Sequence, residues 1–224
     1  MKAPHTPHLL AALTSVILMA GASSLQAQVV SVTYIGPTGG DNYWYAGSSW
    51  TGGVAPNNGQ PTAETIYNAT INNGNTVFLL SYAPRTVNNL TLSNAGLVGG
   101  GVTVNGQLTL GNGATIGNAI TAQTGITFGS SVTLNGALIN GTGPAPATAN
   151  WGSGTLSFNN GTVINYTDST WSAEGGLYDS VSGNNVFTNA GTFIKSSAST
   201  LTIEPTFNSH PVSTLSVNEG ELRL

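Results

Sequence analysis

Cysteine is absent from this chain of 224 residues, and charged residues make up only 5% of it. Without cysteine no disulfide can form, so the fold must depend on burial and backbone hydrogen bonds. An ordinary soluble domain is roughly 25% charged, so a globular enzyme with a normal charged surface is disfavoured. Four basic residues against eight acidic ones attract phosphates weakly, and we expect no nucleic-acid partner.

What the chain does contain is 39% hydrophobic residues and 30 glycines. Disordered chains combine low hydrophobicity with high net charge, and neither holds here, since the formal net charge is -4. The surface must therefore be built from Ser, Thr, Asn, Gln and Gly. These residues suit turns and the exposed faces of β-strands.

The segment 1–27 has the pattern of a secretory signal peptide. An apolar run, Leu9–Met19, leads into small and polar residues that end at Ala27. We predict a signal peptide over 1–27 cleaved after Ala27, with cleavage after Ala22 as the alternative. The run is shorter than the roughly 20 residues that span a bilayer, and no later stretch is apolar enough. We expect export from a bacterium to the extracellular space or the outer-membrane surface, with no membrane span in the mature segment.

After this segment, helical periodicity is nearly missing and short alternating runs of β-branched and aliphatic residues recur. Alternation of this kind indicates strands with one buried face, so the sequence predicts an all-β protein. The runs are 76–80, 89–92, 102–104, 107–110, 126–128, 132–134, 155–158, 163–166, 201–203 and 214–217.

The spacing of these runs favours a solenoid over a sandwich or closed barrel, whose strands are commonly longer. The Leu-Thr-Leu units that begin at Leu90 and Leu108 lie eighteen residues apart, and Val-Thr-Leu at Val132 follows twenty-four later. Such drifting repeats fit coils with insertions at their corners. With about 22 residues per turn, we expect roughly nine turns and a rod ~40 Å long.

The sequence divides into the signal peptide, an N-terminal cap or loop segment over 28–60, and solenoid repeats over 61–224. The cap segment contains Tyr43, Trp44, Tyr45 and Trp50. We favour the interpretation that these rings cover the open end of the core, as terminal solenoid repeats require. The alternative is an exposed aromatic platform for carbohydrate.

A second irregular segment, 140–154, is rich in Pro, Ala and Gly. This composition predicts a loop that leaves one corner of the coil.

Long stretches of the chain resemble a known family. "YWYAGSSWTGGVAPNNGQPTAETIYNATINNGNTVFLL" and "TVNNLTLSNAGLVGGGVTVNGQLTLGNGATIG" look like the start of secreted bacterial right-handed β-helix proteins of the autotransporter-passenger and adhesin type. "NNVFTNAGTFIKSSASTLTIEPTFNSHPVSTLSVNEGELRL" is similar to their repeating Asn-x-Gly turns. The resemblance implies a right-handed parallel β-helix on the cell surface.

Proteins of this kind end in a membrane-embedded translocator barrel or a short sorting tail, and neither is present here. "NEGELRL" at 218–224 echoes "NAGTFIK" at 189–195 and places Leu222 and Leu224 on one face of a last strand. We therefore expect an N-terminal piece of a longer protein, whose missing C-terminal region carries the barrel or tail.

Catalysis has one set of candidate residues. Glycoside hydrolysis usually needs a positioned pair of carboxylates, and Asp168, Glu174 and Asp179 form the only local concentration of acids, with Trp171 and Tyr178 as sugar-stacking partners. The favoured interpretation is that the acids are solvated loop residues. We assign no catalytic residue.

We expect no metal and no cofactor. "GGD" at 39–41 and 178–185 are weak calcium candidates that lack the repeat of calcium-binding β-rolls, and His210 has no companion ligands. Glycosylation sequons lie at Asn68, Asn89, Asn140, Asn160 and Asn165.

The sequence predicts a non-catalytic structural or adhesive β-helix that presents loops to cells, matrix or glycans. Its expected partners are glycans or other cell-surface proteins. The alternative is a carbohydrate-active β-helix, either a polysaccharide lyase or glycoside hydrolase or a glycan-binding module.

Overall fold

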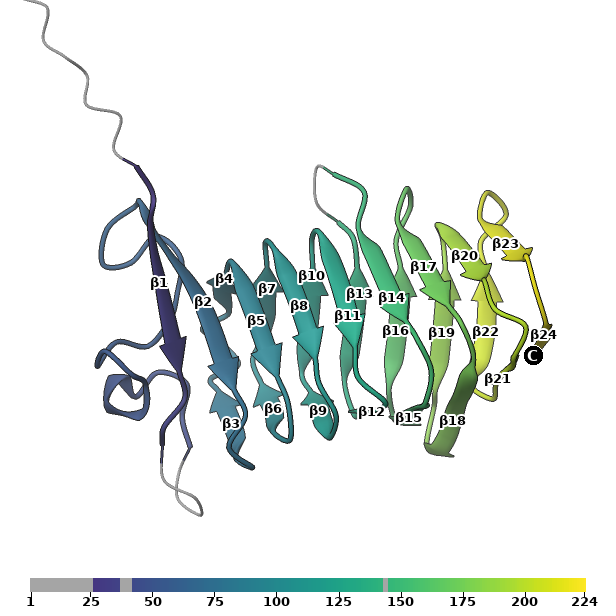
Figure 1. Cartoon of the computed structure of the whole chain (residues 1–224). Coiled ribbons are helices and arrows are strands. Elements are labelled where there is room, and N and C mark those ends of the chain that lie inside the picture. Colours follow the sequence, from purple (N-terminus) through teal and green to yellow (C-terminus); the bar gives the residue numbers. More distant parts are fainter. Residues whose placement is uncertain (1–25, 37–41, 143–144) are drawn as a thin grey trace, which may run out of the picture.

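The computed structural model describes residues 26–36, 42–142 and 145–224. These residues form an all-β solenoid built from three parallel sheets (Figure 1). Most of the predicted signal peptide and all of the 39–41 calcium candidate lie outside the described residues. No described helix has the length and apolar character needed to cross a membrane.

Each sheet takes one strand from every turn. Sheet 1 is formed, in spatial order, by β1 (Gln28–Thr33), β2 (Thr65–Ile71), β5 (Asn89–Leu92), β8 (Gln107–Leu110), β11 (Gly125–Phe128), β14 (Thr148–Trp151), β17 (Thr170–Ala173), β20 (Thr192–Lys195) and β23 (Thr214–Val217). Sheet 2 is formed by β3 (Thr76–Leu79), β6 (Gly96–Gly99), β9 (Ala114–Gly117), β12 (Ser131–Leu134), β15 (Thr155–Asn159), β18 (Gly176–Ser182), β21 (Thr200–Ile203) and β24 (Glu221–Arg223). Sheet 3 is formed by β4 (Arg85–Val87), β7 (Val102–Val104), β10 (Ala119–Ala122), β13 (Ala137–Asn140), β16 (Thr162–Asn165), β19 (Val186–Asn189) and β22 (Thr206–Ser209).

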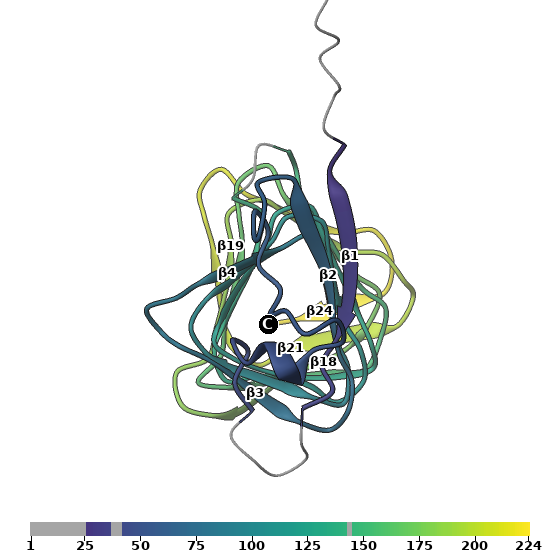
Figure 2. The ribbon, with the colours of Figure 1, turned by 90° about the vertical axis from the view of Figure 1, so that its left-hand side faces the viewer.

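The chain winds from sheet 1 to sheet 2 to sheet 3, so that the sheets form three sides of the coil (Figure 2). β2 to β22 make seven complete turns, and β23 and β24 begin another. The prediction of roughly nine turns is wrong because 28–64 does not wind a turn. There, β1 extends the edge of sheet 1, pairing in parallel with β2.

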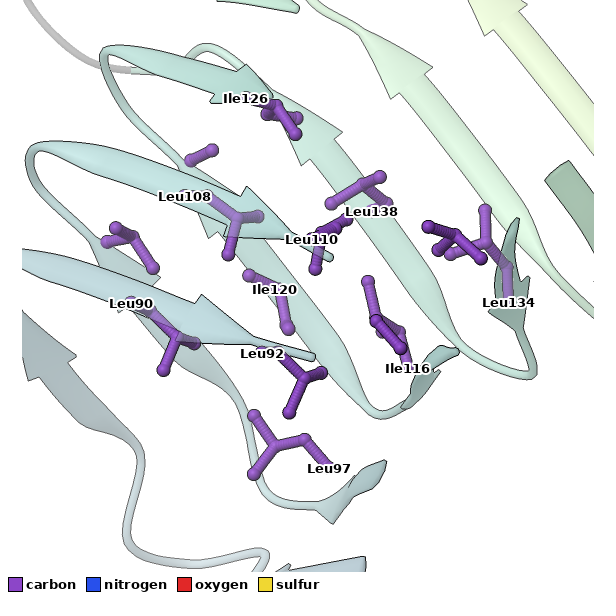
Figure 3. Packing of buried hydrophobic residues seen from close by; sticks show 14 of the residues in the cluster. Leu90, Leu92, Leu97, Leu108, Leu110, Ile116, Ile120, Ile126, Leu134 and Leu138 are labelled. Carbon is purple, nitrogen blue, oxygen red and sulfur yellow. The ribbon is translucent and has the colours of Figure 1, made fainter. Parts of the chain in front are cut away.

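The interior of the early turns is aliphatic because one face of each short strand points inward. Leu90 pairs with Leu108, and Leu108 pairs with Ile126, so that each of these turns advances the chain by eighteen positions. All three are fully buried. Figure 3 shows this column with its neighbours. Burying one Leu or Ile side chain contributes about 1.5–3 kcal/mol, so the columns stabilise the coil along its length.

The interior of the later turns is aromatic. Trp171 lies edge-on to Phe187, with ring centroids 5.0 Å apart, and Phe187 lies edge-on to Phe193 at 5.5 Å. Here Ala149 pairs with Trp171 and Trp171 with Phe193, so that each turn advances the chain by twenty-two positions. Larger rings need a wider cross-section, and these turns are longer than those lined by Leu.

Aromatic rings cover the N-terminal end of the core. Trp44 and Trp50 are each 1% exposed, and their ring centroids lie 4.8 Å apart. Both indole nitrogens donate hydrogen bonds to backbone oxygens, Trp44 Nε1 to Pro56 and Trp50 Nε1 to Trp44. Tyr34 packs edge-on against Trp50 at 5.1 Å. The paired polar atoms allow these large rings to be buried without an unmet hydrogen bond.

The loop predicted over 140–154 is wrong for part of its length. β14 lies inside it and contributes Trp151, which is 1% exposed, to the core. The other inward residue of β14 is the small Ala149, so the run lacks the aliphatic alternation that identifies other strands.

A ladder of buried asparagines runs along the inner edge of sheet 3. Asn140 Nδ2 donates to Asn165 Oδ1, and Asn165 Nδ2 donates to Asn189 Oδ1, both at 2.8 Å. The same amides also donate to backbone oxygens in the following strands of sheet 1. The ladder ties each corner to the next turn. Since Asn140 and Asn165 are fully buried, their sequons lie inside the fold.

We predict that Asn165→Ala lowers the free energy of unfolding by about 2–4 kcal/mol, because it leaves the buried Oδ1 of Asn189 without a donor and opens a small cavity. Chemical denaturation measures the change. The control is Asn184→Ala, an exposed asparagine whose loss should change stability by less than about 0.5 kcal/mol. Equal effects of the two substitutions would show that the ladder adds no stability.

Candidate functional site at the corner before β17

A hollow in the described surface lies where the chain passes from sheet 3 to sheet 1. It has a volume of about 730 Å³ and lies at the upper corners of Figure 1, among the connections that precede β14, β17 and β20. We call it the corner groove. Its lining residues are Thr142, Ala145, Pro146, Tyr166, Thr167, Asp168, Ser169 and Thr192.

Two lining residues have a strained backbone. Asp168 has φ of 65°, and Thr142 has φ of 83°. Asp tolerates the left-handed region, whereas a β-branched residue such as Thr rarely adopts it. Such strain persists only where the surrounding structure holds it, and it is concentrated at functional sites. The backbone of the groove is therefore held in a defined conformation by the residues around it.

Hydrogen bonds hold both walls of the groove in place. The backbone N–H of Ser169 donates to Tyr166 O at 3.1 Å and closes the turn that carries Asp168. Ser169 Oγ accepts a hydrogen bond from the backbone N–H of Ala147 in the opposite wall. Gly141, at φ of 107°, permits this approach, because a side chain there would overlap Ser169 Oγ. The asparagine ladder lies directly behind these residues and fixes the backbone oxygens of Thr170 and Thr192.

The exposed groups of the groove are an aromatic ring, a carboxylate and several hydroxyls. The Tyr166 side chain is 46% exposed, and Asp168 is exposed. The Asp168 carboxylate makes no ion pair or hydrogen bond with any described residue. Such a site can stack a flat, partly apolar ring on Tyr166 and accept hydrogen bonds from its hydroxyls at Asp168.

The three acids considered as weak catalytic candidates lie at three different positions. Asp168 precedes β17, Glu174 follows it, and Asp179 lies within β18 of sheet 2. Five residues lie between Asp168 and Glu174, four of them in the extended strand β17, so the two acids lie at opposite ends of this strand, up to roughly 20 Å apart. Of the three, the structure brings only Asp168 into the corner groove.

The aromatic partners predicted for these acids lie in the core. Trp171 and Tyr178 are fully buried, and Trp171 Nε1 donates to the Tyr178 hydroxyl oxygen at 2.8 Å. Burial raises the pKa of Tyr178 far above its usual range. Trp44 and Trp50 are likewise buried in the cap, so none of these four rings offers a face to a ligand.

Of the four aromatic rings in the cap segment, for which an exposed platform was the alternative interpretation, Tyr43 and Tyr45 reach the surface. Their rings stack with centroids 5.0 Å apart, and Tyr45 is 45% exposed. The ring centroids of Tyr43 and Phe78 lie 6.3 Å apart, and Phe78 is 43% exposed. This cluster lies beside β3 at the opposite end of the coil from the corner groove.

Asp179 has an acidic neighbour on the next turn, Glu204. Tyr178 pairs with Ile203, so the two carboxylates lie side by side on sheet 2. Partial burial, together with the hydrogen bond and the negative charge of Glu204, raises the pKa of Asp179. Among the described residues, no three His, Cys, Asp or Glu side chains lie close enough to hold a metal ion.

Sequence reasoning missed Tyr166, Thr142, Thr192 and Glu204. Tyr166 directly follows the last inward position of β16, Asn165, and opens the Thr-Asp-Ser turn. The position of Tyr166 at the end of a strand was the sequence feature that could have identified it as a site residue. Thr142 and Thr192 are brought together only by the winding of the coil. No local pattern relates them.

Comparisons of the chain with protein-family models, with curated proteins and with solved structures found no match.

We predict that Asp179→Asn stabilises the fold slightly at neutral pH. A carboxyl whose pKa is raised by folding binds its proton more tightly in the folded state. The stability that this tighter proton binding adds is present at pH values below the ordinary pKa of 3.8. It is lost as the pH rises through the pKa of the folded state. The substitution removes the repulsion with Glu204, so the gain should fade as pH drops below that value. Melting temperatures from pH 3 to 8 measure this.

The matched control is Glu174→Gln, which neutralises an exposed carboxylate at a corner without an acidic neighbour on the next turn. Its melting curve should stay close to that of the unmodified protein throughout. A gain for Asp179→Asn that persisted at pH 3 would rule out charge repulsion as its cause.

Proposed function

We propose that this chain is a non-catalytic structural or adhesive protein, exported by a bacterium to its outer surface, whose corner loops bind glycans or other cell-surface proteins. One observation carries the proposal: the corner groove gathers an exposed tyrosine ring, a carboxylate without a partner among the described residues, and hydroxyls around a hollow of about 730 Å³. Saccharides have apolar ring faces and many hydroxyls, and this set of groups matches both.

Export and coil handedness belong to the same proposal. The apolar pattern of 1–27 agrees with a secreted chain. Parallel strands of one sheet joined by a crossover are right-handed in about 98% of cases, which supports a right-handed coil. The resemblance to autotransporter passengers and adhesins adds support for a surface role.

A carbohydrate-active enzyme is the second candidate, favoured by the acidic pair of Asp179 and Glu204. Retaining glycosidases hold their two carboxyl groups about 5–5.5 Å apart, and inverting ones hold them farther apart. Glu204 Oε2 already accepts a hydrogen bond from the backbone N–H of Ser180 at 3.2 Å. The pair also lies on sheet 2, away from the corner groove. Its geometry therefore supports catalysis less well than the groove supports binding.

We predict that the double variant Tyr166→Ala, Asp168→Asn weakens saccharide binding at least about tenfold, because an aromatic stack and a charged hydrogen bond together contribute roughly 2–3 kcal/mol. Asparagine tolerates the left-handed backbone of residue 168, so the corner should keep its shape. Calorimetry with the purified protein and gluco-, galacto-, manno- and N-acetylglucosamine oligosaccharides measures the change.

The control is Tyr82→Ala, which removes a tyrosine that is 81% exposed and lies outside the groove. It should bind like the unmodified protein. Failure of every saccharide to bind, or an equal loss in the control, would contradict the groove as the binding site. Release of reducing ends that stops in Asp179→Asn or Glu204→Gln would instead establish the enzyme.

A further inference from the structure

The outer face of sheet 1 carries columns of stacked hydroxyls. In-register pairing places Thr70, Thr91, Thr109 and Thr127 in one column, through the β2–β5, β5–β8 and β8–β11 ladders. The second column, formed by the first residues of β14, β17, β20 and β23, is Thr148, Thr170, Thr192 and Thr214. Successive turns of parallel sheet lie ~4.8 Å apart, so the hydroxyls repeat regularly along the coil.

This face is also uncharged. Lys195 is the one charged residue in the described strands of sheet 1, and it is fully buried, with Nζ donating hydrogen bonds to the backbone oxygens of Ser197 and Glu219. The strands of sheet 2 include Asp179, Glu221 and Arg223. On sheet 3, outward Ile and Val side chains at Ile139, Ile164 and Val186 interrupt the threonines. From β5 to β17 the outward residues of sheet 1 are uncharged and mostly carry hydroxyls or amides, and in β20 the outward Ile194 interrupts them.

The corner groove opens onto this face. Thr192 lines the groove and belongs to the second threonine column. Tyr166 and Asp168 immediately precede β17, whose first residue, Thr170, is the next member of that column. Most of sheet 1 lies on the N-terminal side of the groove (Figure 1). A ligand longer than the groove would extend over the strands from β14 toward β5.

We propose that the ligand of the corner groove is an extended, uncharged polysaccharide that lies along the outer face of sheet 1. This deepens the proposed function and rests on it. An anionic polymer would lose water around its charges without gaining a cation, since no lysine or arginine points outward from these described strands. A neutral chain exchanges hydroxyl–water bonds for hydroxyl–threonine bonds at each turn. Many weak contacts on one chain add up, so affinity grows with chain length.

The test measures affinity against chain length by calorimetry, with the complete chain and neutral oligosaccharides of two to eight units from the series that binds the groove. The unmodified protein should bind the eight-unit chain at least about tenfold more tightly than the two-unit chain. Thr109→Asp places a charge on the first column, four turns or ~19 Å from Thr192. It should remove most of this gain and leave two-unit binding unchanged.

Thr121→Asp is the matched control, because Thr121 is an outward, half-exposed threonine at the same position of a four-residue strand in sheet 3. It should keep the full dependence on length. Thr127→Asp, at a more exposed position of the same column, repeats the test if Thr109→Asp disturbs folding, which circular dichroism checks.

Several outcomes would overturn the proposal. If the two-unit chain binds and longer chains bind no more tightly, sheet 1 has no role in binding, but the groove and the proposed function remain intact. Tighter binding of polygalacturonate than of the neutral chain would show that the ligand is anionic. A dimer in sedimentation that Thr109→Asp dissociates would show that the face binds a second copy. If no saccharide binds at all, the glycan-binding part of the proposed function fails with it.

Discussion

The register between successive turns is the constraint on which the rest of the structure depends. Because every turn pairs in parallel with the next, one inward position becomes a column through the whole molecule, as Leu90, Leu108 and Ile126 show. The same rule stacks Asn140 on Asn165 and builds the ladder behind the corner groove. Core, ladder and threonine columns are thus three results of one repeated hydrogen-bond pattern.

Turn length follows from what the columns contain. From β5 to β11 the turns lined by Leu and Ile repeat every eighteen positions, whereas from β14 to β20 the turns lined by Trp and Phe repeat every twenty-two. A wider ring needs more backbone around it, and the added residues enter at corners. The corner groove lies in this longer half, where the connections before β14 and β17 have room to project. Core size and surface site are linked in the turn from β14 to β17, where four residues (166–169) connect sheet 3 to sheet 1, whereas two (123–124) do so before β11.

The all-β solenoid could be predicted from sequence because alternation in runs such as 107–110 reports one buried face per strand. Strands in which one of the two inward residues is small or polar, such as Asn140 in β13 and Ala149 in β14, carry a weaker signal and were missed. The repeated Asn-x-Gly unit was also misleading. Segments 189–195 and 218–224 lie twenty-nine positions apart, but the turn there takes twenty-two, so β20 and β24 lie in different sheets.

The candidate site was predictable only in part. Successive side chains of a strand point to opposite faces, so a shift of one position decides whether a residue at a strand end is buried or exposed. Asp168 was identified as an acid beside aromatic residues. Trp171, however, lies two positions before the inward Ala173, so its side chain also points inward and enters the core. Tyr166 comes one residue after the inward Asn165, at the point where the chain leaves the sheet, and its ring stays outside. A shift of one residue decides whether an aromatic side chain stabilises the coil or meets a ligand. Winding then sets the rest, since Thr142 and Thr192 join Tyr166 across adjacent turns.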